Sequence, residues 1–355
     1  MTVRSALSRA PRLAAALLRL RAGRPALASV NLLNRCNQDC PMCSVHEGPD
    51  LALPLPALER LTVALRRGGV KIVEVSGGEP FLRRDLGEVV GILDRSGLLF
   101  TFNTNGTVRN DEGVAALARS RALFQVAVSL DSLDRERYRM LRGRDLLPQA
   151  LDGLERLRAA RLPAPLKINV AVSRHNVEEL PALLAFARER GLYLSAFPVN
   201  QGPGAHRSAC TTFAASPGER ARIGEAFEEL ARLRRRGAPL WEPSAFYRAA
   251  AAFVRGEPLA PCGAGRLYLD VRADGAVAPC VELAPVSTLE GLESGDGWRA
   301  LAGAGAAAEA CRAATPCCYT CTVNLAETAR HPVAFALESA QVLLRARRPR
   351  RGGGA

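Results

Sequence analysis

Residues 71–96 read KIVEVSGGEPFLRRDLGEVVGILDRS and contain one complete strand–turn–helix unit. The β-branched run at 71–75 is typical of a buried strand. Apolar residues then recur at spacings of three and four across 85–96, which predicts an amphipathic helix. Units of this kind build parallel α/β sheets, in which each helix returns the chain to the start of the next strand.

The same unit recurs along the first two thirds of the chain. We expect strands near residue 30 and at 71–75, 98–103, 124–130, 166–172 and 192–197. We expect helices near 55–67, 85–96, 111–119, 146–161, 176–190 and 217–236. This succession predicts a parallel α/β sheet with helices outside it. Periodicity alone does not separate an open doubly wound sheet from a barrel.

The pattern changes after about residue 240, where Gly, Pro and Cys become frequent and the strand-like runs become short. We therefore place a domain boundary between 237 and 255. The predicted organisation has four parts, which are a basic amphipathic N-terminal segment (1–25), the α/β domain (26–240), a small Cys-rich domain (255–330) and a basic tail (331–355).

The charge of the chain has a compositional explanation. The formal net charge is +13, yet only Lys71 and Lys167 of the 48 basic residues are lysines, as expected for a GC-rich genome that encodes its basic residues as Arg. A basic chain can attract nucleic acid. No run of basic residues interleaved with aromatic ones occurs in the body of the chain, so we expect no nucleic-acid partner.

The cysteines indicate metal rather than disulfides. The chain has ten of them in 355 residues, and all except Cys210 fall into two short-spaced groups. Disulfide frameworks belong to short secreted chains. The N-terminus shows no secretory leader, because its longest uncharged apolar run, 13–18, is too short. We therefore expect metal-binding cysteines in a reducing cytoplasm.

The first group is Cys36-x3-Cys40-x2-Cys43, directly after the first predicted strand. A cluster held entirely by protein takes four thiolates, so three leave one iron with an open position. An open position is where a metal does chemistry. The alternative is a structural zinc site with a distant fourth ligand, for which His46 is a candidate.

A second motif, Ser76-Gly77-Gly78-Glu79-Pro80, closes the second predicted strand. Glycines let backbone approach a ligand closely, and Glu79 is expected to accept from an ammonium group. Alone, this segment could be a simple turn. Both motifs follow consecutive strands, however, and α/β barrels place their active sites at those strand ends.

Together the two motifs resemble the radical S-adenosylmethionine (radical SAM) superfamily. The resemblance implies a partial (β/α)6 TIM-like barrel over about 26–236. It also implies a 4Fe–4S cluster on Cys36, Cys40 and Cys43, with SAM on the fourth iron. Met42 would lie beside the adenine, and Gly77, Gly78, Glu79 and Pro80 would meet the SAM amino group. Asn103, Ser129, Asp131, Arg142 and Asn169 match its polar contacts to SAM, although each taken alone also fits a structural role.

What the resemblance implies for activity is reductive cleavage of SAM to a 5′-deoxyadenosyl radical, which abstracts hydrogen from a substrate. The electron would come from a donor such as flavodoxin or ferredoxin. A non-enzymatic iron–sulfur or zinc-binding module is the alternative of another class, and production of 5′-deoxyadenosine would decide between them.

The second cysteine group contains Cys262, Cys280 and the segment CRAATPCCYTC at 311–321. Asp274-Gly275 predicts a hairpin turn that brings Cys262 and Cys280 together. The region resembles the SPASM or twitch extensions of radical SAM enzymes, which implies an auxiliary 4Fe–4S cluster. We expect Cys262, Cys280, Cys318 and Cys321 as its ligands, with Cys311 or Cys317 as replacements. Ala308 stands where the full SPASM motif has a cysteine. The alternative for this region is a structural zinc ribbon.

The substrate and the ends of the chain leave alternatives open. We expect a small-molecule or lipid-linked substrate, with a ribosomally made peptide as the alternative. The auxiliary cluster would either take an electron from a substrate radical, which makes the net reaction an oxidation, or bind the substrate. In the loop 198–213, His206 could serve acid–base chemistry and Cys210 could donate hydrogen, although an ordinary surface loop is the preferred interpretation. Segments 3–24 and 333–351 are basic and amphipathic. They either cap the barrel or place a cytoplasmic enzyme in peripheral contact with the membrane surface.

Overall fold

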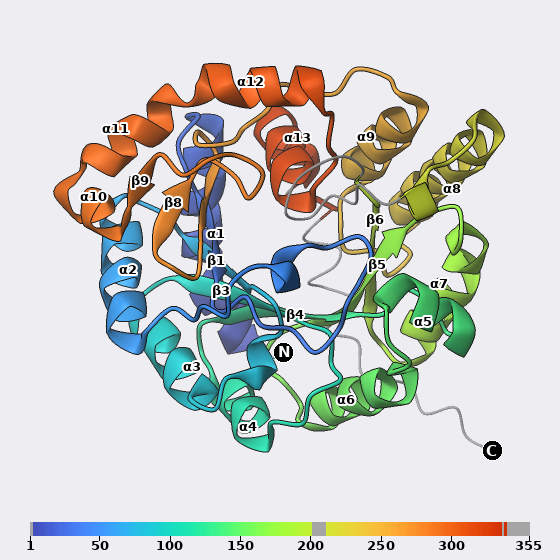
Figure 1. The fold of residues 1–355 in the computed structure, drawn as a ribbon, viewed down its shortest axis with the longest axis horizontal. Coiled ribbons are helices and arrows are strands. Elements are labelled where there is room, and N and C mark those ends of the chain that lie inside the picture. The colour runs from blue at the N-terminus through green and yellow to red at the C-terminus, as the bar shows by residue number, and fades with distance from the viewer. Residues whose placement is uncertain (1–2, 201–210, 336, 339–355) are drawn as a thin grey trace.

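The computed structural model describes residues 3–200, 211–335 and 337–338. It contains the six expected strand–helix units, arranged as a curved parallel sheet with helices outside it (Figure 1). The strands are β1 Leu27–Asn31, β2 Ile72–Ser76, β3 Leu99–Thr104, β4 Leu123–Ser129, β5 Leu166–Val172 and β6 Tyr193–Pro198. The helices that follow them are α2 Leu55–Arg67, α3 Leu86–Arg95, α4 Asp111–Arg119, α6 Leu147–Ala159, α7 Leu180–Glu189 and α8 Pro217–Arg235. The predicted partial barrel is confirmed.

Two helices before residue 256 were not expected from the pattern. α5 Arg135–Arg142 follows β4 and precedes α6, and α9 Ser244–Arg255 packs against α8. α5 is short and carries five charged residues in eight, so it has few apolar residues to mark it in the sequence. It still buries Tyr138 and Leu141 under the barrel wall.

The core lies between the outer face of the sheet and the helices. On α2, Leu58, Leu61 and Leu65 recur at helical spacing and are buried, while the rest of the helix surface is largely polar. Alternate strand residues such as Val73 and Val75 are also fully buried in this layer. Burial of this apolar stripe is the main force that holds each helix on the sheet.

The sheet continues past the predicted domain boundary. β7 Tyr268–Val271 pairs in parallel with β1, and β8 Ala276–Ala278 and β9 Ser287–Thr288 add antiparallel strands beyond it. Gly275 between β7 and β8 has φ +83°, a conformation that favours glycine, so the predicted hairpin is present. The C-terminal helices are α10 Leu289–Ser294, α11 Asp296–Gly303, α12 Gly305–Ala314 and α13 Leu325–Arg330. Where the chain divides into domains stays a prediction.

The N-terminal helix α1 Val3–Arg21 packs across the end of the barrel where the strands begin. Buried Arg9 donates to Pro163 O before β5 (3.2 Å), and Arg19 donates to Gly68 O before β2 (2.7 Å). Leu20 is buried in a small apolar cluster with the C-terminal region. This geometry favours the capping interpretation of the segment.

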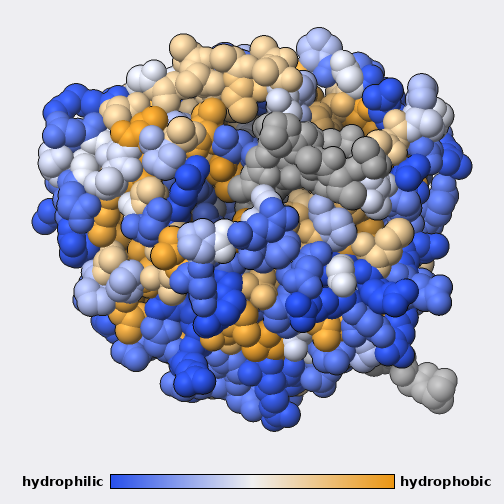
Figure 2. All heavy atoms as spheres, in the orientation of Figure 1, coloured by the Kyte–Doolittle hydropathy of each residue, from blue (hydrophilic) through white to orange (hydrophobic). Residues whose placement is uncertain are grey.

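Peripheral membrane contact stays a prediction. Leu18 on α1 is 70% exposed, and Val333 and Leu337 near the C-terminal end are 71% and 64% exposed. Most of the face shown in Figure 2 is hydrophilic. None of the helices in the described part of the chain combines the length and apolar character needed to cross a bilayer. Residues 339–351 of the basic tail lie outside the described residues.

Candidate active site

The cysteine loop after β1 is held against the end of β2. Gly78 N donates to Leu33 O (2.7 Å), and Glu79 N donates to Arg35 O (3.0 Å). A Cβ atom on Gly78 would lie 2.1 Å from Arg35 O, and one on Gly77 would lie 2.4 Å from Leu33 O. The two glycines are therefore required for the loop to approach the strand, as the motif predicted.

The three thiols of this loop surround one cavity. Cys36, Cys40 and Cys43 all line a space of about 300 Å³ at the carboxyl ends of the strands. Gln38 N donates to Cys36 Sγ (3.4 Å), and Cys40 Sγ donates to Arg142 O (3.6 Å). Burial raises the pKa of Cys36, and it raises that of Cys40 to about 11. A metal that binds Cys36 and Cys40 must therefore displace their protons.

Glu79 is turned away from this cavity, contrary to the expectation that it meets a ligand. Its side chain is fully buried and accepts from Phe81 N (2.9 Å), Thr104 Oγ1 (2.7 Å) and Asn105 N (2.6 Å). Burial raises its pKa to about 7 despite these donors. Pro80, also buried, is absent from the cavity wall as well. Glu79 thus fixes the ends of β2 and β3 from behind the wall, and the backbone of the glycines faces the cavity.

Arg142 and Asp131 form a buried ion pair beside the cysteines. The Arg142 Nε lies 2.6 Å from Asp131 Oδ2, and Asp131 Oδ1 accepts from Ala171 N (2.7 Å). Asp131 is completely buried and only Arg142 lines the cavity. A Cβ atom on Gly143 (φ +75°) would lie 2.2 Å from Asp39 O, so the chain after Arg142 presses against the cysteine loop. Asp131 therefore positions Arg142 and does not face a ligand itself.

The remaining predicted polar contacts do reach the cavity. Met42, Asn103, Ser129 and Asn169 all line it. The Asn169 Oδ1 atom is buried and has no hydrogen-bond partner among the described residues. An orphaned acceptor in a cavity wall is costly unless a ligand completes it.

The sequence analysis did not identify several residues of the cavity wall, chiefly two carboxylates. Glu74 accepts from Asn103 Nδ2 (3.0 Å), and Asp270 Oδ1 accepts from Asn31 Nδ2 (3.3 Å). Both line the cavity. The available signal was a single acidic residue inside each apolar strand run, IVEVS and YLDV. Such a residue in a buried strand indicates that one strand face borders a polar space.

The second cysteine group opens onto the same cavity. Cys280 and Cys321 line it together with the three thiols of the first group. Cys280 belongs to the same small core as Tyr268, and Cys262 and Cys321 pack against that core. All nine described cysteines are free thiols. The cavity therefore lies between two sets of thiols.

Cys317 and Cys318 are adjacent in the sequence, and Cys317 is the one that lies close to the other cysteines of the second group. Burial raises the pKa of Cys280 to about 12, and Cys317 lies close enough to raise it further. Cys321 is influenced by Cys280 and Cys317 in the same way. Cys318 is completely buried in the main hydrophobic core, where only Cys317 and Arg312 affect its pKa after burial.

Other predicted residues lie apart from the cavity or beyond the described residues. His46 lies in a short 3-10 turn, Val45–Glu47, and does not line the cavity. His206 and Cys210 lie outside the described residues. Among those that are described, no three Cys, His, Asp or Glu side chains are arranged to hold a single metal ion.

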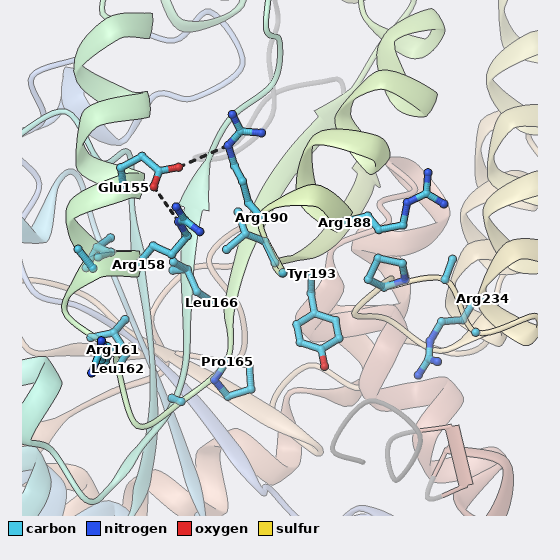
Figure 3. A pocket seen from close by; sticks show the side chains of 18 residues that line it. Glu155, Arg158, Arg161, Leu162, Pro165, Leu166, Arg188, Arg190, Tyr193 and Arg234 are labelled. Atoms are coloured by element: carbon cyan, nitrogen blue, oxygen red, sulfur yellow. Dashed lines mark hydrogen bonds and ion pairs between the residues drawn. The ribbon is translucent and has the colours of Figure 1, made fainter. Parts of the chain in front are cut away.

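A larger hollow of about 950 Å³ lies at the opposite end of the barrel, where β5 and β6 begin. Figure 3 shows Arg158 and Arg190 reaching Glu155, at 2.7 and 3.4 Å. These arginines stand at the ends of α6 and α7, where cations are favoured by the negative helix terminus. The helix ends explain the arginines, and none of the described residues that line the hollow is a cysteine.

The residues of the smaller cavity fit an open iron–sulfur cluster with a bound amino acid derivative. Three free thiols converge there, the cradle formed by Gly77 and Gly78 admits no side chain, and Asn169 offers an unfilled acceptor. Three thiolates at one cluster leave an iron for a non-protein ligand.

Residues 30–187 match the Radical SAM superfamily. The chain is 33% identical over 172 residues to a probable GTP 3′,8-cyclase of Pyrococcus abyssi, which covers 47% of this chain and 55% of that protein. The fold is similar to Streptococcus suis SuiB bound to S-adenosylmethionine (TM-score 0.60, 18% identity, 76% of this chain and 64% of SuiB). It is also similar to anSMEcpe with bound AdoMet (TM-score 0.62, 12% identity, 91% and 97%).

These similarities support different conclusions. At 12–18% identity the likeness to the solved structures concerns the fold alone. The chain spans about half the length of several curated relatives that it matches, all of them GTP 3′,8-cyclases or probable ones.

Proposed function

The chain carries a radical SAM domain over residues 30–187, and from this premise we propose that it cleaves SAM reductively and uses the product to abstract hydrogen from a small-molecule or lipid-linked substrate. The observation that carries the proposal is one cavity lined by Cys36, Cys40 and Cys43 and reached by the second cysteine group. A 4Fe–4S cluster and SAM are the cofactors of this superfamily. When bound, they supply a 5′-deoxyadenosyl radical, which is chemistry that no side chain of the protein provides.

The protein's own residues would bind the cluster and SAM and hold them in place. Cys36, Cys40 and Cys43 would hold three irons of the cluster. The backbone at Gly77 and Gly78 admits the SAM amino group, because no side chain intervenes. Arg142, fixed by Asp131, supplies the one described cation of the wall, which suits a carboxylate.

For the second group we propose an auxiliary 4Fe–4S cluster on Cys262, Cys280, Cys317 and Cys321. Cys317 replaces the Cys318 of the sequence-based prediction, because it is the member of the pair that lies near Cys280 and Cys321. A cluster here would border the substrate cavity and could accept an electron from a substrate radical. The net reaction would then be an oxidation.

Two other substrate classes have some support. SuiB has been crystallised with its precursor peptide SuiA, and anSMEcpe with a peptide, so a peptide substrate is the alternative for this chain. The curated relatives are cyclases of GTP, so a cyclisation without net oxidation is the other. The cavity volume of about 300 Å³ favours a small substrate or a single side chain.

The experiment is anaerobic reconstitution followed by detection of 5′-deoxyadenosine with SAM and dithionite. Wild-type protein should carry about eight irons and form 5′-deoxyadenosine. The Cys36→Ala/Cys40→Ala/Cys43→Ala variant should lose about half of the iron and all of the product. Product formation in that variant, or none in the wild type, would refute the proposed function.

A further inference from the structure

The cavity wall near Cys321 of the second cysteine group is acidic. Ser29 on β1 pairs in register with Glu74 on β2 and with Asp270 on β7. Residues paired across parallel strands project from the same face of the sheet. Glu74, Ser29 and Asp270 therefore form a row across three strands, and all three line the cavity.

Each carboxylate in this row is held in place by an amide. Asn103 Nδ2 donates to Glu74 Oε1 (3.0 Å), and Asn31 Nδ2 donates to Asp270 Oδ1 (3.3 Å). Asp270 is 1% exposed. Fixed carboxylates in a largely enclosed wall are expensive to desolvate unless they meet a complementary group.

A buried hydroxyl in the same wall also lacks a complete set of partners. Tyr268, two residues before Asp270 on β7, is 2% exposed and lines the cavity. Its hydroxyl lies against the Cys280 sulfur and finds no oxygen or nitrogen partner among the described residues. A buried hydroxyl in this position points to a polar ligand group.

The described lining of the cavity holds fewer basic residues than carboxylates. Arg142 is the one described basic residue that lines the cavity, and it is paired with Asp131. Lys167, buried near Glu74, forms its ion pair with Glu242 at 3.6 Å and does not line the cavity. With Arg142 assigned to the SAM carboxylate, an anionic group such as a triphosphate would meet two carboxylates here and no further cation of the described wall.

We propose that Glu74 and Asp270 bind a protonated amine of the substrate, with Ser29 and Tyr268 as additional hydrogen-bonding groups. This rests on the proposed function and sets its substrate class as cationic. It also separates this chain from the GTP 3′,8-cyclases that it resembles, because GTP presents its triphosphate as an anion. A carboxylate pair of this kind selects a cation by charge-assisted hydrogen bonds.

The test uses three nitroxides of one skeleton and different charge, which are amino-TEMPO (cation), hydroxy-TEMPO (neutral) and carboxy-TEMPO (anion). Binding to the reconstituted protein is measured by electron paramagnetic resonance at low salt, without reductant and with saturating SAM to fill its own site. We expect amino-TEMPO to bind about tenfold or more tightly than hydroxy-TEMPO, and carboxy-TEMPO to bind most weakly.

The variants are Glu74→Gln and Asp270→Asn, alone and combined. Each keeps the carbonyl oxygen that accepts from Asn103 or Asn31, so the fold should persist, and circular dichroism checks this. The double variant should lose the preference for the cation. The matched control, Glu189→Gln/Glu290→Gln, removes two exposed carboxylates and should retain it.

Three outcomes would overturn the inference. They are equal binding of the cationic and neutral probes, an unchanged preference in the double variant, and cation binding that is seen in a parallel titration without SAM but is absent with saturating SAM, which would assign the carboxylates to SAM. The proposed function is read separately from 5′-deoxyadenosine. SAM cleavage without a cation preference would refute only the inference about the cationic substrate. A cation preference without SAM cleavage would refute only the proposed function.

Discussion

The two cysteine groups line one cavity but are assembled in different ways. Cys36, Cys40 and Cys43 come from one short loop, which the glycines of the neighbouring strand and Arg142 press into place. The second group draws on residues from Cys262 to Cys321 and depends on a small core shared with α1. The geometry of cysteines from one loop should change little when other parts of the molecule are altered. The geometry of cysteines that are distant in sequence should be sensitive to such changes.

The strongest test of this comparison removes the second group. In Cys262→Ala/Cys280→Ala the first loop is untouched, so we expect loss of about half of the iron with continued SAM cleavage in the absence of substrate. Iron and zinc are measured by mass spectrometry and 5′-deoxyadenosine by chromatography. Unchanged iron, or zinc in place of iron in the wild type, would contradict an auxiliary cluster.

A finer test separates Cys317 from Cys318. Cys317→Ala should lose the auxiliary iron, because its thiol lies with Cys280 and Cys321. Cys318→Ala should keep the iron and lose about 1 kcal/mol of unfolding free energy, the usual result of a small buried void. Iron analysis and urea unfolding of both variants show which of the two cysteines is the ligand. The reverse pattern would restore the ligand set expected from sequence.

A third test concerns Glu79, which lies behind the cavity wall next to the first cysteine group. Burial raises the pKa of Glu79 from 4.5 to about 7, so the folded state holds this proton more tightly than the unfolded chain. Its contribution to stability is present below about pH 4.5 and is lost as the pH rises through about 7, by at most about 3 kcal/mol.

Urea unfolding at pH 5 and pH 8 measures this dependence. Wild-type unfolding free energy should fall more steeply with pH than that of Glu79→Gln, which does not titrate. The variant should be less stable at both pH values, because its amide NH2 faces one of the three donors around Glu79. Parallel pH slopes would show that Glu79 keeps an ordinary pKa.

Much of the fold was accessible from local patterns. The six strands and the helices that follow them were predicted within a few residues, because apolar spacing and strand length are properties of short segments. The meeting of the cysteine loop with Gly77 and Gly78 also followed from sequence. Parallel strands bring their carboxyl ends to one edge, so motifs after consecutive strands must be neighbours.

What the tertiary structure decided depends on long-range pairing and on side-chain direction. β7 pairs with β1, which sets Asp270 opposite Glu74, and no short segment encodes that partnership. Glu79 turns inward because donors from β3 and the following loop meet it there. Cys317 and Cys318 differ by one position along the chain, and packing against the main core takes the second out of the cysteine set. Spacing along the sequence names candidate ligands, and only the packed core determines which of two adjacent side chains faces the others.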